Sequence, residues 1–388
     1  MARKNIAVLD FGTSRVSVMI GDKGINNAFD IKGYGETAYA GYLDGEFLQP
    51  ETLMQDVQEA LACAENNARC KITHLYIGVP AEFSSVVVKK GKLTFDKAHK
   101  INDNDVQDLF DSVDDFDGQE TLTVINRAPV YYVLNDDCKI IEPKGKITDE
   151  ISGTISFVLC ETAFLNKVKQ ILAPLHIQHI EFFSEPLSEC LYLVDPEQRD
   201  GCAILVDSGF LTTSVSIVMG DGLLSLRSFS LGSGYIIADF SEVFGLNVEQ
   251  AERLKRKIAL SVIPEADDII QLQVGQQKIK EINAKQAYQI VEYRVKQIGK
   301  MIKKCLDMYS ADLPSYLPLM ITGGGISYIE GMPDVIQAEL GRSVEIVASE
   351  DPELNQPQLS SALSLLDLAV KQNKQIKNSF FVRLFKKN

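Results

Sequence analysis

Residues 202–217 read CAILVDSGFLTTSVSI, and residues 5–18 read NIAVLDFGTSRVSV. In each stretch an apolar run ends in an aspartate, and a glycine turn with hydroxyl residues leads into a strand of two-residue period. Each stretch therefore predicts a β-hairpin with a carboxylate and a glycine at its tip. Glycine lets backbone N–H groups approach phosphate oxygens, and a neighbouring aspartate can hold a hydrated Mg²⁺. Two such hairpins that face each other would clamp a nucleotide.

A third glycine cluster, LMITGGGISYIEGM at 319–332, follows another apolar strand and precedes a helix start. The repeated hairpin predicts an α/β protein with two duplicated domains around a cleft. For each glycine taken singly, an ordinary tight turn is the alternative interpretation. The order of the three motifs favours a nucleotide site.

Composition narrows the classes of protein that the chain can represent. Its 388 residues are 45% hydrophobic and 24% charged, which is typical of a globular protein with two or three domains. The net charge of −14 argues against a general nucleic-acid surface. The seven cysteines lack CxxC spacing, so we expect reduced, buried thiols and no zinc site. The start MARKNIAVLD has no signal-peptide stretch, and we expect a cytoplasmic body without membrane spans.

Changes in pattern divide the chain into five predicted segments. The first domain takes residues 1–80 and returns at 156–200, with a β-rich inserted subdomain at 81–155 between these parts. The second domain follows at 201–370, and residues 371–388 form a linker and tail. Helical periodicity is clearest at 51–68, 184–194, 285–309 and 357–372. His176 and His179 are interpreted as surface residues.

The C-terminal tail has an unusual charge pattern. No acidic residue follows Asp367, whereas six basic residues do: Lys371, Lys374, Lys377, Arg383, Lys386 and Lys387. On a helix, one face would carry Phe380, Phe381, Leu384 and Phe385, with Arg383, Lys386 and Lys387 opposite. This pattern predicts an amphipathic helix that binds anionic membrane lipid. The alternative is a helix end that packs back onto the body, which has little use for so uniform a charge.

Taken together, these features resemble FtsA, the family of actin-like bacterial cell-division proteins that tether the tubulin-like FtsZ ring to the membrane. The resemblance rests on LDFGTS, GYLDGEFLQPETLMQDVQEALACAE, the insertion at 81–155, FLTTSVSIVMGDGLLSLRSFSLGSGYIIADFSEVFGL, AERLKRK, ITGGGISYIEGM and the basic tail. It implies the actin-like ATPase fold with an FtsA-type inserted subdomain. It also implies a peripheral protein of the cytoplasmic membrane face that binds ATP and Mg²⁺, polymerises, and contacts FtsZ and other division proteins.

The resemblance further assigns roles to single residues. Loop one (residues 10–14) and loop two (residues 207–213) would bind phosphate, the glycine loop (residues 323–325) would pass under the adenosine, and a helix would contact ribose and base. The nucleotide-binding set is Asp10, Gly12, Thr13, Ser14, Asp207, Gly209, Thr212, Thr213, Gly232, Gly234, Glu252, Lys255, Gly323, Gly324 and Gly325. Asp10 and Asp207 would hold Mg²⁺ through water. Glu185 is the candidate catalytic residue that orients an attacking water; its alternative is a solvated carboxylate at a helix N-terminus.

Loop two departs from the pattern of the family, which typically reads Asp-x-Gly-Gly-Gly-Thr. Here Phe210 and Leu211 stand where bare backbone is expected, and their side chains disfavour positive φ and close phosphate approach. We therefore expect nucleotide binding with at most weak ATPase activity. Two alternatives stay open. A PilM-like pilus-assembly scaffold would not need the basic tail, and a sugar or acid kinase would need a catalytic aspartate and an intact loop two.

Overall fold

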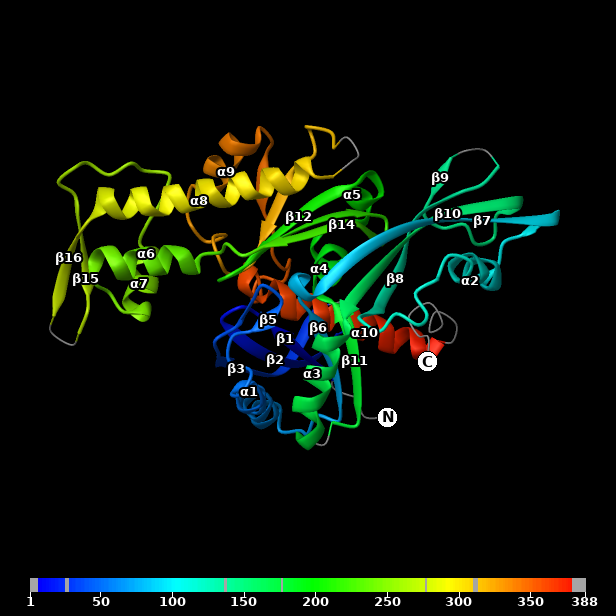
Figure 1. Cartoon of the computed structure of the whole chain (residues 1–388), viewed down its shortest axis with the longest axis horizontal. Helices are drawn as coiled ribbons and strands as arrows, with labels where there is room; N and C mark the ends of the chain where they lie inside the picture. Colours follow the sequence, from blue (N-terminus) through cyan, green and yellow to red (C-terminus); the bar gives the residue numbers. More distant parts are fainter. Residues whose placement is uncertain are drawn as a thin grey trace.

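The computed structural model describes residues 6–24, 28–135, 138–175, 177–275, 278–309 and 313–378, and two five-stranded sheets form its centre (Figure 1). The first sheet has the order β11-β6-β1-β2-β3, with β1 Ile6–Phe11, β2 Arg15–Lys23, β3 Phe29–Ala38, β6 His74–Val79 and β11 His179–Ser184. The second has the order β14-β13-β12-β17-β18, with β12 Ala203–Ser208, β13 Thr213–Met219, β14 Gly222–Phe229, β17 Leu319–Thr322 and β18 Val344–Ile346.

The two sheets repeat one topology. Strand β1 pairs antiparallel with β2 and parallel with β6, and β12 pairs antiparallel with β13 and parallel with β17. Even the register agrees, because Asp10 lies opposite Ser17 and Asp207 lies opposite Ser214. The two predicted hairpins and the duplication are therefore confirmed.

Helices cover both faces of the first sheet. On one face, α1 (Leu53–Ala68) and α3 (Thr162–Leu172) pack on Ala7 and Leu9. Helix α1 buries the apolar residues that recur at three- and four-residue spacing in its sequence: Leu53, Val57, Ala60, Leu61 and Ala64. On the other face, α10 (Ser360–Asn378) packs on Ile6 and Val8. Strand side chains alternate between faces, which explains this division. Helix α10 thus packs on the first sheet although it follows the second in the chain, which the predicted boundary at 370 did not anticipate.

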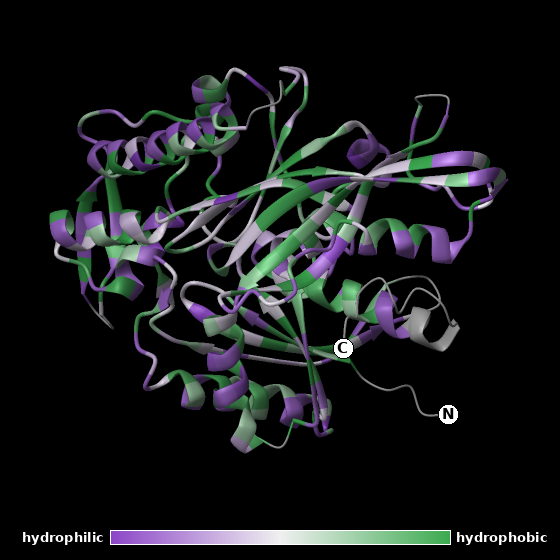
Figure 2. Cartoon of the chain, turned by 45° about the vertical axis from the view of Figure 1, so that its right-hand side comes forward, coloured by the Kyte–Doolittle hydropathy of each residue, from purple (hydrophilic) through white to green (hydrophobic). Residues whose placement is uncertain are grey.

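The second sheet is covered by a larger set of elements. The elements that pack on one face of this sheet and around it are α6 (Gly234–Phe244), α7 (Val248–Lys255), α8 (Ala284–Asp307), α9 (Met332–Leu340) and the hairpin of β15 (Ile269–Gln273) and β16 (Ile279–Asn283). On the other face, α4 (Glu185–Leu193) packs Leu187 and Cys190 against Ala203 and Leu205, with α5 (Pro196–Gly201) beside it. Hydrophobic residues concentrate in the central strands in Figure 2. Helix α4 also contacts α10, so it lies at the junction of the two halves.

The insertion forms its own sheet of order β7-β10-β8-β9, with β7 Ser84–Lys100, β8 Leu122–Val133, β9 Lys139–Ile140 and β10 Ile147–Glu161. Helix α2 (Asp103–Asp111) packs Leu109 and Phe110 on this sheet, and Asn102 begins it with a capping box. Strand β10 continues six residues beyond the predicted end at 155. The short elements are β4 Tyr42–Leu43, β5 Glu46–Phe47, and the 3₁₀ turns Ala81–Phe83, Ala173–Leu175 and Pro357–Leu359.

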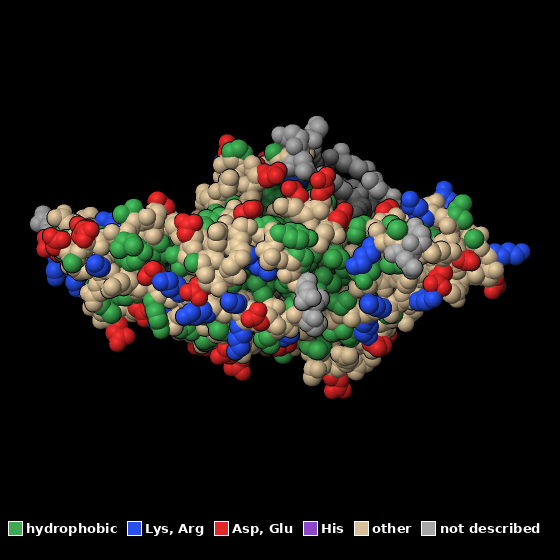
Figure 3. Space-filling model, turned by 90° about the horizontal axis from the view of Figure 1, so that it is seen from above, with side chains coloured by type: hydrophobic (Ala, Val, Ile, Leu, Met, Phe, Trp, Pro, Cys, Tyr) green, Lys and Arg blue, Asp and Glu red, His purple; other side chains and the backbone are tan. Residues whose placement is uncertain are grey.

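The cysteines, the charged side chains and the helices can each be compared with what composition led us to expect. Cys160, Cys190, Cys202 and Cys305 are buried free thiols, whereas Cys63 and Cys138 are exposed, so the expectation of burial holds only in part. In the face shown in Figure 3, acidic and basic side chains are interspersed. Among the described helices, none is both long and apolar enough to cross a membrane.

Candidate nucleotide cleft

Loop one and loop two touch directly. The Oγ1 atom of Thr13 accepts hydrogen bonds from the backbone N–H groups of Phe210 (3.1 Å) and Leu211 (2.9 Å). Thr13 is buried, and Gly209 fits beside its hydroxyl. One hydroxyl oxygen therefore occupies the position between two N–H donors that an anion's oxygen would take. We name this contact the Thr13 clasp.

The glycine loop packs on loop two. The Gly325 N–H donates to the Ser208 carbonyl at 2.6 Å, and a Cβ at Gly325 would lie 2.4 Å from that oxygen. Gly323 has φ of +90°, and a Cβ there would lie 2.0 Å from Asp207 Oδ1. Sequence reasoning attributed these glycines to close approach of an adenosine. The structure gives a different physical reason, since the backbone and carboxylate of loop two fill the space.

Gly232 and Gly234 make room for Phe210. The Gly234 N–H donates to the Phe210 carbonyl at 2.7 Å, and a Cβ on Gly234 would lie 2.9 Å from the Phe210 ring. A Cβ on Gly232 would meet the Phe210 carbonyl oxygen at 2.5 Å. The bulky residue in loop two is thus accommodated by two glycines on the adjoining segment. The two glycines therefore compensate for the bulk of Phe210 in loop two.

A polar corner lies at the start of α6 and the end of α7. Lys255 is 1% exposed, and its Nζ lies 2.9 Å from Glu252 Oε2 and 3.1 Å from Ser233 Oγ. Tyr328, just beyond the glycine loop, places its ring 5.2 Å from that Nζ. Burial lowers the pKa of Lys255. The pair Glu252 and Lys255 therefore contacts Tyr328, just beyond the glycine loop.

Four carboxylates converge behind the loops. Burial raises the pKa of Asp10 to about 6 and, with the charge of Asp10 as the second cause, that of Asp207 to about 7. Burial and the charges of Asp10 and Asp207 raise the pKa of Glu185 well above its usual range. Glu185 is 8% exposed, so its interpretation as a solvated carboxylate is wrong.

Glu189, the fourth carboxylate, was missed by sequence reasoning. It is 2% exposed, and burial followed by the charges of Asp207 and Glu185 raises its pKa well above the usual range. The signal was present in the stretch SEPLSE, because residues four apart share one face of a helix.

Several of the remaining predicted site residues make hydrogen bonds to neighbouring segments. Thr213 is buried and its Oγ1 donates to the Leu231 carbonyl at 2.8 Å, so its hydroxyl proton is used away from the cleft. Ser14 and Thr212 are partly buried, and the Thr212 carbonyl accepts from Gly209 N–H at 2.9 Å. Gly12 accepts a hydrogen bond from the Tyr39 hydroxyl through its carbonyl. The membrane residues Phe380, Phe381, Arg383, Leu384, Phe385, Lys386 and Lys387 lie outside the described residues.

The start of α10 joins these loops. Ser361 donates to Asp10 Oδ1 at 2.6 Å, and Thr322, just before the glycine loop, donates to Ser360 at 2.7 Å. The helix then runs along the first sheet toward the basic tail (Figure 1). One helix therefore contacts both halves of the cleft at its first residues and continues into the tail at its other end.

The donor set fits a nucleotide in part. Backbone N–H groups of loop two and the hydroxyl of Thr13 suit phosphate oxygens, and Asp10 and Asp207 suit a hydrated cation. In the described arrangement, however, the N–H groups of Phe210 and Leu211 are taken by the Thr13 clasp. A phosphate could reach them only if the clasp opened.

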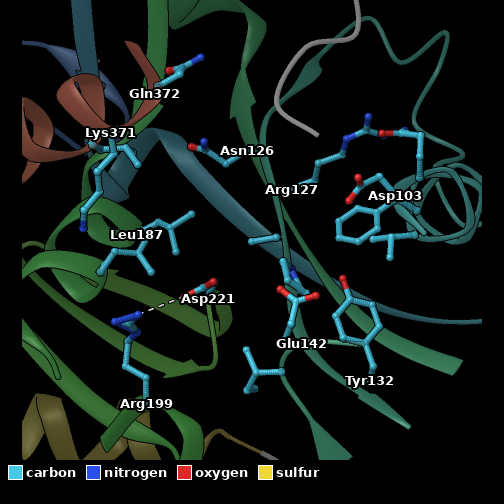
Figure 4. A pocket seen from close by; sticks show the side chains of 18 of the residues that line it. Asp103, Asn126, Arg127, Tyr132, Glu142, Leu187, Arg199, Asp221, Lys371 and Gln372 are labelled. Carbon is cyan, nitrogen blue, oxygen red and sulfur yellow. Dashed lines mark hydrogen bonds and ion pairs between the residues drawn. The ribbon is translucent and has the colours of Figure 1, made fainter. Parts of the chain in front are cut away.

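A separate cavity of about 310 Å³ lies away from this cleft (Figure 4). It is bounded by Asn126 and Arg127 of β8, Leu187 of α4 and Lys371 and Gln372 of α10. On its wall, Arg199 holds Asp221 at 3.1 Å. None of the predicted nucleotide-binding residues lines it. The inserted subdomain, the junction helix and the C-terminal helix thus share one cavity.

Known proteins resemble this chain along nearly its whole length. Residues 204–364 match the family model described as cell division protein FtsA. Curated proteins named cell division protein FtsA from Streptococcus pneumoniae and Bacillus subtilis are 23% and 21% identical to it. These alignments cover 95% and 93% of this chain and 81% and 82% of the relatives. The resemblance to the FtsA family is thereby confirmed.

Solved structures confirm the actin-like fold. A PilM–PilN type IV pilus biogenesis complex aligns with TM-score 0.63 and 15% identity over 95% of this chain and 99% of that one. MreB5 of Spiroplasma citri bound to AMPPNP aligns with TM-score 0.54 and 10% identity over 98% and 100%. At these identities the PilM likeness concerns the fold alone, and the sequence relatives favour FtsA over the scaffold alternative.

Proposed function

We propose that this divergent relative of the FtsA cell-division proteins is an actin-like adaptor, which binds ATP between its two sheets and tethers a division ring to the membrane. The observation that carries the nucleotide site is the Thr13 clasp together with the glycine loop packed on loop two. These contacts bring three distant segments with phosphate-binding chemistry to one place. The MreB5 structure, which shares the fold, has AMPPNP bound, which supports nucleotide binding by a protein of this fold.

Nucleotide binding would proceed by exchange at the clasp. A phosphate oxygen accepts the N–H groups of Phe210 and Leu211, and the Thr13 hydroxyl turns to donate to phosphate. The exchange keeps every buried donor paired, so it avoids the cost of leaving a buried N–H without a partner. Lys255 and Glu252 would contact the base and ribose beside the glycine loop.

Turnover would be slow. ATP would bring Mg²⁺, which Asp10 and Asp207 would hold through water. Glu185 would orient an attacking water, but burial raises the pKa of its carboxyl well above the usual range, which disfavours the deprotonated form that a base requires. We therefore assign ATP a structural role, with self-assembly as its consequence.

Helix α10 supports a connection between nucleotide and membrane. Ser361 bonds to Asp10 in loop one, and the same helix leads into the basic tail. Rearrangement at loop one would thus act on the helix that carries the membrane-binding segment. Weak binding by one tail becomes strong when a polymer presents many tails. The ring partner would be FtsZ, bound through its C-terminal tail, with other division proteins alongside it.

Co-sedimentation with vesicles tests this function. Full-length protein and a version that ends at Lys377 are mixed with phosphatidylglycerol vesicles, with and without Mg-ATP. We expect the full-length protein to sediment with the vesicles, more so with Mg-ATP and less so at high salt. Sedimentation that does not depend on the tail, or its absence under every condition, contradicts the adaptor function.

A further inference from the structure

The buried carboxylates form a tighter cluster than a nucleotide site requires. Glu185, Glu189 and Asp207 each offer an oxygen that lies within 4.8 Å of the others. Glu185 and Glu189 project from successive turns of α4, and Asp207 comes from β12 of the second sheet, on which α4 packs. Their convergence therefore depends on the packing of α4 against that sheet.

The two glutamates are also incompletely paired. Glu185 Oε2 and Glu189 Oε1 are buried and have no hydrogen-bond partner among the described residues. Asp10 differs, because its two oxygens accept from Ser361 and Ser17. Burying a polar oxygen without a partner is unfavourable, and burying several carboxylates together is more so. A bound cation would neutralise the charge of these carboxylates and supply a partner for both unpaired oxygens.

We propose that Glu185, Glu189 and Asp207 bind a divalent cation directly, and that they do so without nucleotide. Three carboxylate oxygens suit the hard cations Mg²⁺, Mn²⁺ and Ca²⁺. From typical metal–oxygen distances, ligands on opposite sides of the ion lie roughly 4.2 Å apart for Mg²⁺ and roughly 4.8 Å apart for Ca²⁺. The three oxygens, all within 4.8 Å of one another, are close enough to share one such ion.

This site differs from the ion that ATP would bring. That ion is held by phosphates and, through water, by Asp10 and Asp207, whereas the proposed one is ligated directly and needs Glu189. The proposal shares Asp207 and its location with the proposed nucleotide site. A cation here would tie α4, which lies at the junction of the two halves, to β12 of the second sheet before nucleotide binds.

The test uses full-length protein stripped of metal with EDTA and free of nucleotide. MnCl₂ is titrated in, with bound Mn²⁺ followed by electron paramagnetic resonance and the melting temperature measured in parallel. We expect one bound Mn²⁺ per chain and a rise in melting temperature. Glu189→Gln, which keeps the shape and removes the charge, should weaken Mn²⁺ binding at least 10-fold and abolish the rise. Glu242→Gln, on the exposed side of α6, is the control and should behave as the parent.

Three results overturn the proposal: no Mn²⁺ binding by the parent, equal binding by Glu189→Gln, or equal weakening by the control. The first would mean that the glutamates share protons instead of a metal. Glu185→Gln is the second variant if Glu189→Gln does not fold, with the same expectation. Mg-ATP binding is measured separately. ATP binding without free Mn²⁺ binding overturns only this inference, and the converse overturns only the nucleotide site.

Discussion

Leu211 donates its backbone N–H to the side chain of Thr13 at 2.9 Å, although 198 positions separate the two residues. The bond joins the tips of two hairpins that belong to different sheets. It explains how loop two keeps its backbone donors satisfied despite a leucine and a phenylalanine. It also defines what a nucleotide must displace.

Thr13→Val tests the clasp. Valine keeps the shape of threonine but cannot accept the N–H groups of Phe210 and Leu211, so two donors lose their partner. We expect the free energy of unfolding to fall by about 1–3 kcal/mol in the absence of nucleotide. Chemical denaturation measures this free energy, and Thr212→Val in loop two is the control with a smaller loss. Equal losses in the two variants would show that the clasp contributes nothing of its own.

The ion pair between Lys23 and Asp367 fixes α10 on the first sheet. Their atoms lie 2.6 Å apart, and the side chains are 7% and 3% exposed. Asp367→Asn leaves a buried lysine without its countercharge, so we expect a loss of about 3–5 kcal/mol in unfolding free energy. Lys371 also contacts Asp367 but is 56% exposed. Lys371→Ala should therefore cost about 0–1 kcal/mol, and a cost as large as that of Asp367→Asn would contradict this account of the pair.

Stability should depend on pH through Asp207. Its pKa is raised to about 7 in the folded chain, whereas an unfolded aspartate has a pKa of about 3.9. Between these values the folded state binds more protons, so this group stabilises the fold below about pH 4 and its contribution is lost as the pH rises through about 7. Asp207→Asn should reduce that decline in metal-free protein. Parallel curves of unfolding free energy against pH for parent and variant would show that Asp207 titrates normally.

The tail prediction rests on sequence alone. Phe381→Glu with Phe385→Glu places charge on the apolar face of the predicted helix, where burial in lipid becomes unfavourable. We expect this double variant to lose sedimentation with anionic vesicles while the melting temperature of the body stays unchanged. Retained sedimentation would exclude the amphipathic helix as the membrane contact. Ser379→Glu, on the opposite side of the predicted helix, serves as the control for added charge.

Local patterns predicted much of the fold, whereas long-range contacts escaped prediction. The hairpins and α1 were predictable because the alternation of strands and the periodicity of Leu53 to Ala64 are local signals. The packing of α10 on the first sheet was not, because its apolar residues suit either sheet. Phe210 was expected to disturb the backbone of loop two, because nothing in the sequence shows that Gly232 and Gly234 leave space for it.

The candidate site divides in the same way. Asp10, Asp207 and the glycine loop could be predicted because each follows a strand in a recognisable turn. The roles of Glu185 and Glu189 depend instead on their burial. Glu185 and Glu189 are buried because α4, which carries both, lies at the junction of the two halves. Neither burial nor the carboxylate cluster can be inferred from a helix that the sequence also allows on the surface.

Calorimetric titration of Mg-ATP into the full-length protein and into Lys255→Met tests the nucleotide cleft most directly. Methionine fills the space of the buried lysine but cannot pair with Glu252 or contact a base. We predict saturable binding of Mg-ATP to the parent at one site per chain, with affinity at least 10-fold weaker in Lys255→Met. Absence of binding by a folded parent, or equal affinity in the two proteins, would contradict a nucleotide site between the two sheets.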